Sequence, residues 1–100
     1  MSWAEHHTTS SRLAEAAEAA LKAGETQQAL ELYSQACDYE LRALKDLDPD
    51  RSRTLGVTVT SAFWLLRKAG RTAEAEEFAS RWLQDPTLPA LAKSEMTLPS

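Results

Sequence analysis

The sequence predicts an all-α protein made of two antiparallel helical hairpins and a short C-terminal capping helix. Apolar residues recur every three or four positions along most of the chain, which is the period of a helix with one buried face. Gly or Asp-Pro separates the periodic segments. The clearest period runs from Thr26 to Leu47, and a helix of roughly 20 residues is about 30 Å long, so the shorter segments must pack along it. Its predicted buried stripe contains Leu30, Tyr33, Cys37, Leu41 and Leu44, with Ala29, Ala36 and Leu47 beside them.

A chain of 100 residues suits one domain. We expect a flexible N-terminus over residues 1–9, a helical domain over 10–96 and a flexible C-terminus over 97–100. Trp3 is the notable residue of the first segment: it either folds back onto the domain or marks a contact with another chain.

The first hairpin is predicted from Arg12 to Leu47, with Ser10 or Ser11 as the N-cap of its first helix. Gly24 is expected to supply the left-handed residue that ends this helix, and the short turn makes the two helices antiparallel. The predicted face of the first helix is Leu13, Ala16, Ala17, Ala20 and Leu21.

The second hairpin is predicted to begin at Asp48-Pro49-Asp50, with Asp48 as cap and Pro49 in the first helical position, and its first helix ends near Ala69. The β-branched run 57–60 favours a strand by intrinsic preference, but the wider helical spacing outweighs it. That spacing is carried by Leu55, Val59, Ala62, Phe63 and Leu66.

A fourth helix follows the reversal at Gly70 and ends before Asp85-Pro86, and a short capping helix is expected from about Pro89 to Glu95. The apolar face of the fourth helix is Ala75, Phe78, Ala79, Trp82 and Leu83.

The two hairpins look like copies of one unit. Gly24, Ala29, Tyr33 and Ala36 are matched in order by Gly70, Ala75, Ala79 and Trp82, an offset of 70 − 24 = 46 residues. A small residue after the turn, an aromatic residue four positions on and then another small residue resembles the second helix of a tetratricopeptide repeat. The long second helix followed by Asp48-Pro49-Asp50 resembles the extended repeats of kinesin-light-chain type. A four-helix bundle without repeat ancestry is the alternative.

The tetratricopeptide resemblance implies that the first helix of each hairpin lines a concave partner-binding face. The expected groove positions are Ala14, Glu18, Leu21 and Lys22 in the first copy, and Val57, Thr60, Trp64, Arg67 and Lys68 in the second. An aromatic residue beside positive charge suits an acidic, partly apolar peptide or helix. Trp64 could instead pack under the terminal segment. The sequence has no asparagine, which the family's carboxylate clamp requires.

The composition excludes several other functions. The formal net charge of -4 disfavours nucleic-acid binding, and no apolar run is long enough to span a membrane. The first residues lack the basic region and apolar stretch of a secretory signal, so a cytoplasmic protein is expected. Asp46, Asp48 and Asp50 alternate as in a calcium loop, but Arg51 stands where that loop needs glycine. Cys37 is the sole cysteine and is expected to be buried. No catalytic constellation, metal site or cofactor motif appears, so no enzyme activity and no cofactor are predicted.

The predicted function is therefore a non-catalytic adaptor or scaffold that binds another protein. One alternative is a helical bundle that binds an apolar small molecule beside Phe63, Phe78 and Trp82. The other is a structural subunit that associates with further copies of itself through its uncapped ends.

Overall fold

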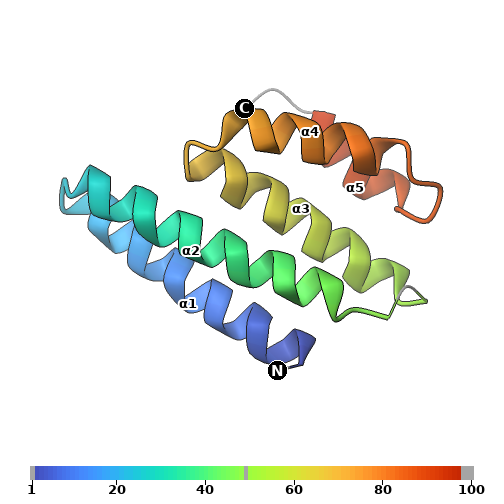
Figure 1. The fold of residues 1–100 in the computed structure, drawn as a ribbon, viewed down its shortest axis with the longest axis horizontal. Helices are drawn as coiled ribbons and strands as arrows, with labels where there is room; N and C mark the ends of the chain where they lie inside the picture. Colours follow the sequence, from blue (N-terminus) through green and yellow to red (C-terminus); the bar gives the residue numbers. More distant parts are fainter. Residues whose placement is uncertain (1, 49, 98–100) are drawn as a thin grey trace.

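The computed structural model describes residues 2–48 and 50–97, and within these ranges the chain is helical with no strands. The helices are α1 (Trp3–Lys22), α2 (Thr26–Lys45), α3 (Ser52–Lys68), α4 (Thr72–Leu83) and α5 (Ala90–Thr97), as Figure 1 shows. The predicted all-α fold, with two hairpins and a short C-terminal helix, is confirmed.

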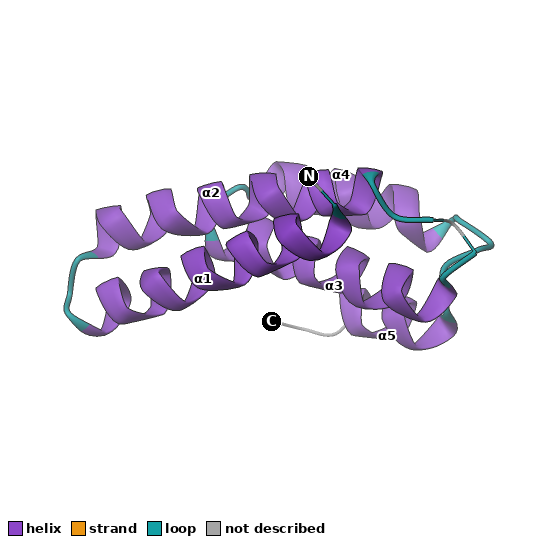
Figure 2. Cartoon of the chain, turned by 90° about the horizontal axis from the view of Figure 1, so that it is seen from below, coloured by secondary structure: helices purple, strands orange, loops and turns teal. Residues whose placement is uncertain are grey.

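The helices form two layers. Figure 2 shows α1, α3 and α5 in one layer and α2 and α4 in the other. The helices α1 to α4 pack mainly on their neighbours in sequence, most extensively α1 on α2, whereas α5 packs more on α3 than on α4. The molecule is correspondingly flat, with principal extents of 40 × 32 × 18 Å.

Both hairpin corners have the same backbone geometry. Gly24 and Gly70 have φ values of 80° and 78°, in the left-handed region that favours glycine. The residue after each glycine donates its N–H back to the last turn of the preceding helix, Glu25 to Ala20 O and Arg71 to Leu66 O, both at 2.9 Å. This is the hydrogen bond of a Schellman C-cap. The 46-residue offset found in the sequence therefore relates two equivalent corners.

The prediction that the first helix starts after Ser10 or Ser11 is wrong. The α1 helix begins at Trp3, and its N-cap is Ser2, whose hydroxyl accepts the Glu5 N–H at 3.2 Å in a capping box. Ser10 is instead buried inside α1 and donates to Ala36 O of α2 at 2.8 Å. Residues 3–9, which were expected to precede the domain, thus belong to α1.

The boundaries of the helices that follow the first hairpin also differ slightly from the prediction. The α3 helix begins at Ser52 with Arg51 as its N-cap, so Asp48 does not cap it; the Asp48 carboxylate instead accepts the Asp50 N–H at 3.0 Å. Pro49 lies outside the described residues. The α5 helix extends to Thr97, and the remaining residues of the predicted flexible C-terminus, 98–100, lie outside the described part.

The core lies between the two layers. The predicted α3 stripe is buried throughout, as are Tyr33 and Cys37 of α2. Two predictions for the core are wrong: Ala16 is exposed, and Leu21 is 51% exposed. Within α2 the buried face includes Glu40, which is 0% exposed, while Leu41 and Leu44 lie at its partly buried edge.

Candidate protein-binding groove

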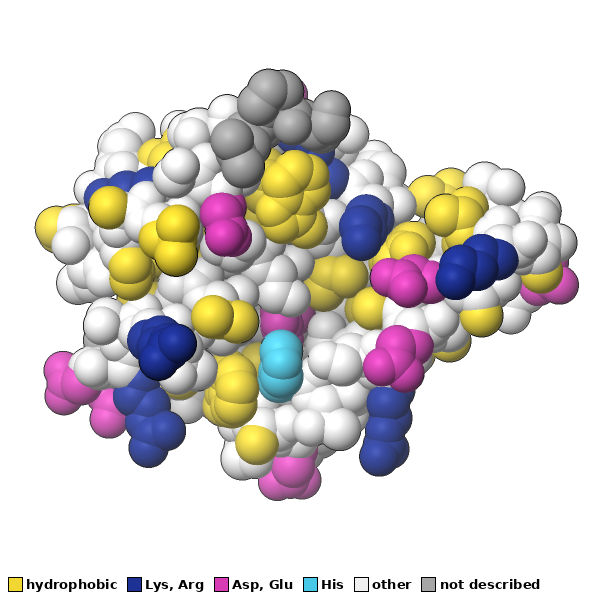
Figure 3. All heavy atoms as spheres, turned by 180° about the vertical axis from the view of Figure 1, so that it is seen from behind, with side chains coloured by type: hydrophobic (Ala, Val, Ile, Leu, Met, Phe, Trp, Pro, Cys, Tyr) yellow, Lys and Arg dark blue, Asp and Glu magenta, His cyan; other side chains and the backbone are white. Residues whose placement is uncertain are grey.

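An open hollow lies where α1 and α3 part over α2, near the first hairpin corner. It has a volume of about 390 Å³. The α1 helix contributes Leu21 to it and α3 contributes Lys68, while α2 forms the floor with Thr26, Ala29, Leu30 and Tyr33. We call this hollow the α1–α3 groove. Figure 3 shows the molecule from behind, with hydrophobic side chains spread over much of this face and charged side chains of both signs between them.

Tyr33 forms part of the groove floor and lies between opposite charges. The Lys68 ammonium lies 5.7 Å from the centroid of the Tyr33 ring, within the range of a cation–π contact. Burial raises the pKa of the Tyr33 phenol, and the negative charge of Glu18 raises it further. The groove therefore combines an apolar floor with a cation on the α3 side and an anion on the α1 side.

The opposite end of α1 is fixed to both α2 and α3. The Trp3 indole N–H donates to Thr58 Oγ1 at 3.0 Å, and the Trp3 ring stacks on His7 with centroids 4.9 Å apart. His7 Nδ1 lies 2.9 and 3.1 Å from the two carboxylate oxygens of Glu40. His6 Nδ1 lies 2.7 Å from Oδ2 of Asp46, the C-cap residue of α2. These contacts hold the start of α1 beside α3, so the α1–α3 groove is open toward the hairpin corner and closed at this end.

The predicted partner-binding residues fall into separate regions. Lys68 lines the α1–α3 groove together with Leu21, and the charge of Glu18 acts on its floor, while Lys22 is exposed on α1 next to Leu21. Val57 and Thr60 line a different hollow, formed by α3 and α5.

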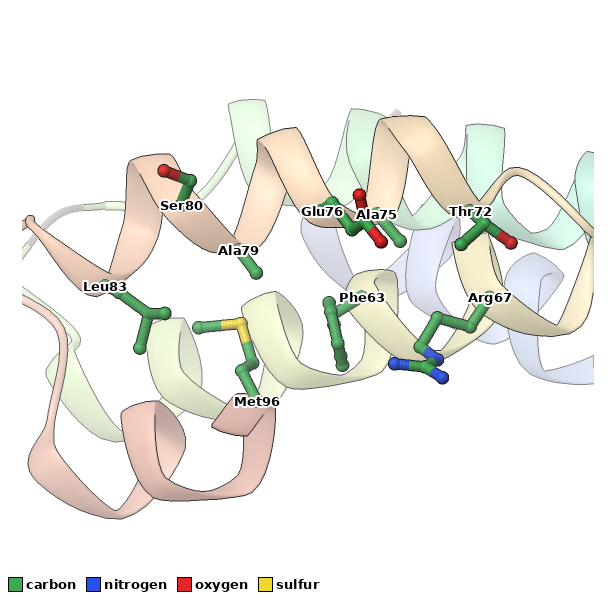
Figure 4. A pocket seen from close by; sticks show the side chains of 9 residues that line it. All are labelled: Phe63, Arg67, Thr72, Ala75, Glu76, Ala79, Ser80, Leu83 and Met96. Carbon is green, nitrogen blue, oxygen red and sulfur yellow. The ribbon is translucent and has the colours of Figure 1, made fainter. Parts of the chain in front are cut away.

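Arg67 lines a third hollow, between α3, α4 and α5, with Phe63 and Met96 (Figure 4). Its guanidinium carbon lies 5.5 Å from the ring centroid of Trp64, which is partly buried against the core. The structure thus divides the predicted face among three hollows instead of forming one continuous site.

Sequence reasoning missed an apolar hollow on the opposite layer, between α2 and α4. Its volume is about 430 Å³, and its apolar lining consists of Leu41, Leu44, Leu66, Phe78 and Trp82. We call it the α2–α4 groove. Phe63 does not reach this groove, so the three aromatic residues expected to surround a small molecule do not share one pocket.

The described residues carry few reactive groups. Burial raises the pKa of the Cys37 thiol to about 12, and its Sγ donates to Ala62 O at 3.9 Å. Among residues 2–48 and 50–97, no three His, Cys, Asp or Glu side chains come together as a metal site would require. None of the helices in the same ranges has the length and apolar content of a membrane span.

Comparison with protein-family models, curated proteins and solved structures found no match. The tetratricopeptide resemblance therefore remains a prediction from the sequence, and the site must be interpreted from its own chemistry.

Proposed function

We propose that this chain is a non-catalytic interaction adaptor that binds a peptide or helix of a partner protein in the α1–α3 groove. The observation that supports this most is the position of Leu21, which is 51% exposed at the edge of a hollow whose floor is Tyr33. A half-exposed leucine beside an aromatic floor is the kind of site in which an apolar anchor of a partner gains most from burial.

The charges around the groove indicate how the partner would be oriented. An apolar side chain would occupy the hollow, and an acidic side chain would lie near Lys68, with Lys22 exposed close by. Charge complementarity of this type favours one binding direction and speeds association more than it raises affinity.

Selection of peptides from a random display library against the full chain tests the proposal. We expect enriched peptides to combine apolar and acidic residues. Their affinity should fall at least about tenfold, equivalent to 1.4 kcal/mol, for both Leu21→Ser and Lys68→Glu. Lys45→Glu is the matched control, because Lys45 lines the α2–α4 groove on the other layer. Failure to enrich any peptide, or peptides that bind both groove variants like the parent chain, would rule out this site.

A second candidate function is supported by the α2–α4 groove, where Phe78 and Trp82 lie beside Leu41 and Leu44. An apolar small molecule would bind there instead of a peptide. Native mass spectrometry of the purified chain tests this candidate. A bound ligand that is lost in Phe78→Ser and kept in Leu21→Ser would support it, and a ligand-free chain would contradict it.

A further inference from the structure

The two most exposed large hydrophobic side chains among the described residues lie in one hollow, away from the α1–α3 groove. Leu91 is 73% exposed and Val57 is 57% exposed, and both line the hollow formed by α3 and α5. Gly56 lets α5 approach α3 closely, since a Cβ at Gly56 would lie 3.4 Å from the Ala92 Cβ. We call this surface the α3–α5 patch, and its members are Arg53, Val57, Thr60, Pro89, Leu91 and Glu95.

The α3–α5 patch carries opposite charges at its two ends. The α5 helix runs in the same direction as α3, because Pro89 and Ala92 lie at Gly56 and Met96 lines a hollow with Phe63. Arg53 precedes Gly56 by about one turn on α3, and Glu95 follows Ala92 by about one turn on α5. Arg53 and Glu95 are therefore separated by roughly 9 Å along the helix direction. Neither side chain forms an ion pair with another described residue.

We propose that the α3–α5 patch binds a second copy of this chain through a twofold axis at its centre. A twofold interface places the same surface on both sides, so one end of the patch meets the other end of the partner's patch. Arg53 of each copy would then face the partner's Glu95, and Val57 and Leu91 of both copies would pack together at the axis. A uniformly charged patch would repel its own copy, whereas this arrangement pairs every charge.

This dimer is independent of the proposed adaptor function, because Val57 and Leu91 do not line the α1–α3 groove. Two copies joined in this way would present two α1–α3 grooves, and a partner with two matching segments would bind with increased avidity.

Sedimentation equilibrium of the full chain over a wide concentration range tests the dimer. Because the patch is small, we expect a weak dimer with a dissociation constant on the order of 100 µM. Leu91→Lys should abolish dimerisation, and Arg53→Glu should weaken it at least tenfold by placing like charges opposite each other. Leu21→Ser is the matched control, because it changes an exposed leucine outside the patch. Circular dichroism should show unchanged helicity in all variants.

Exchanging the charges at positions 53 and 95 distinguishes this twofold geometry from non-specific hydrophobic association. The double variant R53E/E95R should recover the parent's dimerisation, since each pair is restored with reversed sign. An equimolar mixture of R53E and E95R should form heterodimers, because one copy then carries acids at both ends and the other carries bases. A chain that stays monomeric at the highest concentration, or dimers that are insensitive to these exchanges, would overturn the proposal.

Discussion

Glu40 is the most deeply buried charged side chain among the described residues. Its side chain is 0% exposed, and both of its carboxylate oxygens lie within hydrogen-bonding distance of the same nitrogen, His7 Nδ1. A buried carboxylate without a hydrogen-bonding partner loses hydration that nothing replaces. Glu40 therefore depends on a histidine 33 residues away to be accommodated in the core.

Replacing His7 should destabilise the fold strongly. We expect His7→Ala to lower the free energy of unfolding by about 3 kcal/mol, because it leaves the Glu40 carboxylate buried and unpaired. The double variant H7A/E40M should recover much of this loss, since an apolar side chain of similar length needs no partner. Urea denaturation followed by circular dichroism measures both. Asp46→Asn is the control, because the Asp46 carboxylate that pairs with His6 is 38% exposed, and it should cost less than about 1 kcal/mol. An equal cost at both sites would contradict the role given to burial of the carboxylate.

The Cys37 thiol should be inert in the folded chain. Burial raises its pKa from 9.0 to about 12, so the reactive thiolate is nearly absent at pH 8. We expect thiol reagents to label Cys37 only after urea unfolding. As pH rises, the thiol loses its proton at a lower pH in the unfolded chain than in the folded chain. This group's contribution to stability should therefore decline between about pH 9 and pH 12. Cys37→Ala should remove that part of the pH dependence. Rapid labelling of the native chain would contradict this account.

At the residue scale, the sequence predicted apolar burial better than polar burial. Tyr33 and Cys37 were predicted from helical spacing, and both are buried. Glu40 falls three residues after Cys37 on the same stripe, which was a signal that it faces the core. Its partner could not be found in this way, because the pairing of His7 with Glu40 depends on how α1 packs on α2.

At the scale of the elements, the two glycine corners determine where the helices turn back. Both glycines have positive φ, and a Cβ at Gly24 would meet no atom within 4 Å, so steric crowding is not the reason for glycine there. The requirement is conformational, because side chains disfavour the left-handed region.

Gly24→Ala and Gly70→Ala should therefore cost similar amounts, about 1 to 2 kcal/mol each, in the free energy of unfolding. Thermal and urea unfolding would measure the two losses. Gly56→Ala is a useful comparison, since Gly56 is inside α3 and its φ is not positive; there, contact with α5 decides the effect. Very different losses at the two corners would indicate that the hairpins are not equivalent.

The element boundaries were predicted well where glycine marks them and less well at the N-terminus. The segment Ser2-Trp3-Ala4-Glu5 has the spacing of a capping box, and this signal was available in the sequence. Residues 1–9 show no clear apolar period, so the sequence predicts a flexible end there. In the structure, polar contacts of His6 and His7 replace the missing apolar ones.

At the scale of the whole molecule, packing between sequence neighbours leaves hollows on both layers. The α1–α3 groove lies on one layer and the α2–α4 groove on the other. Helical spacing placed Leu41, Leu44, Phe78 and Trp82 on the apolar faces of their helices, but it could not show that they line an open hollow between α2 and α4. The sequence also could not predict that the binding face is divided among three hollows. This division follows from where α5 packs and from how α1 and α3 diverge.

Mapping a selected peptide onto the chain by amide chemical shifts in NMR tests the central claim most directly. The account predicts that shifts cluster at residues 18–22 of α1, 29–33 of α2 and 64–68 of α3, and that Lys68→Glu removes them. Shifts concentrated on Leu41, Leu44, Phe78 and Trp82 would contradict it, because they would place binding in the α2–α4 groove.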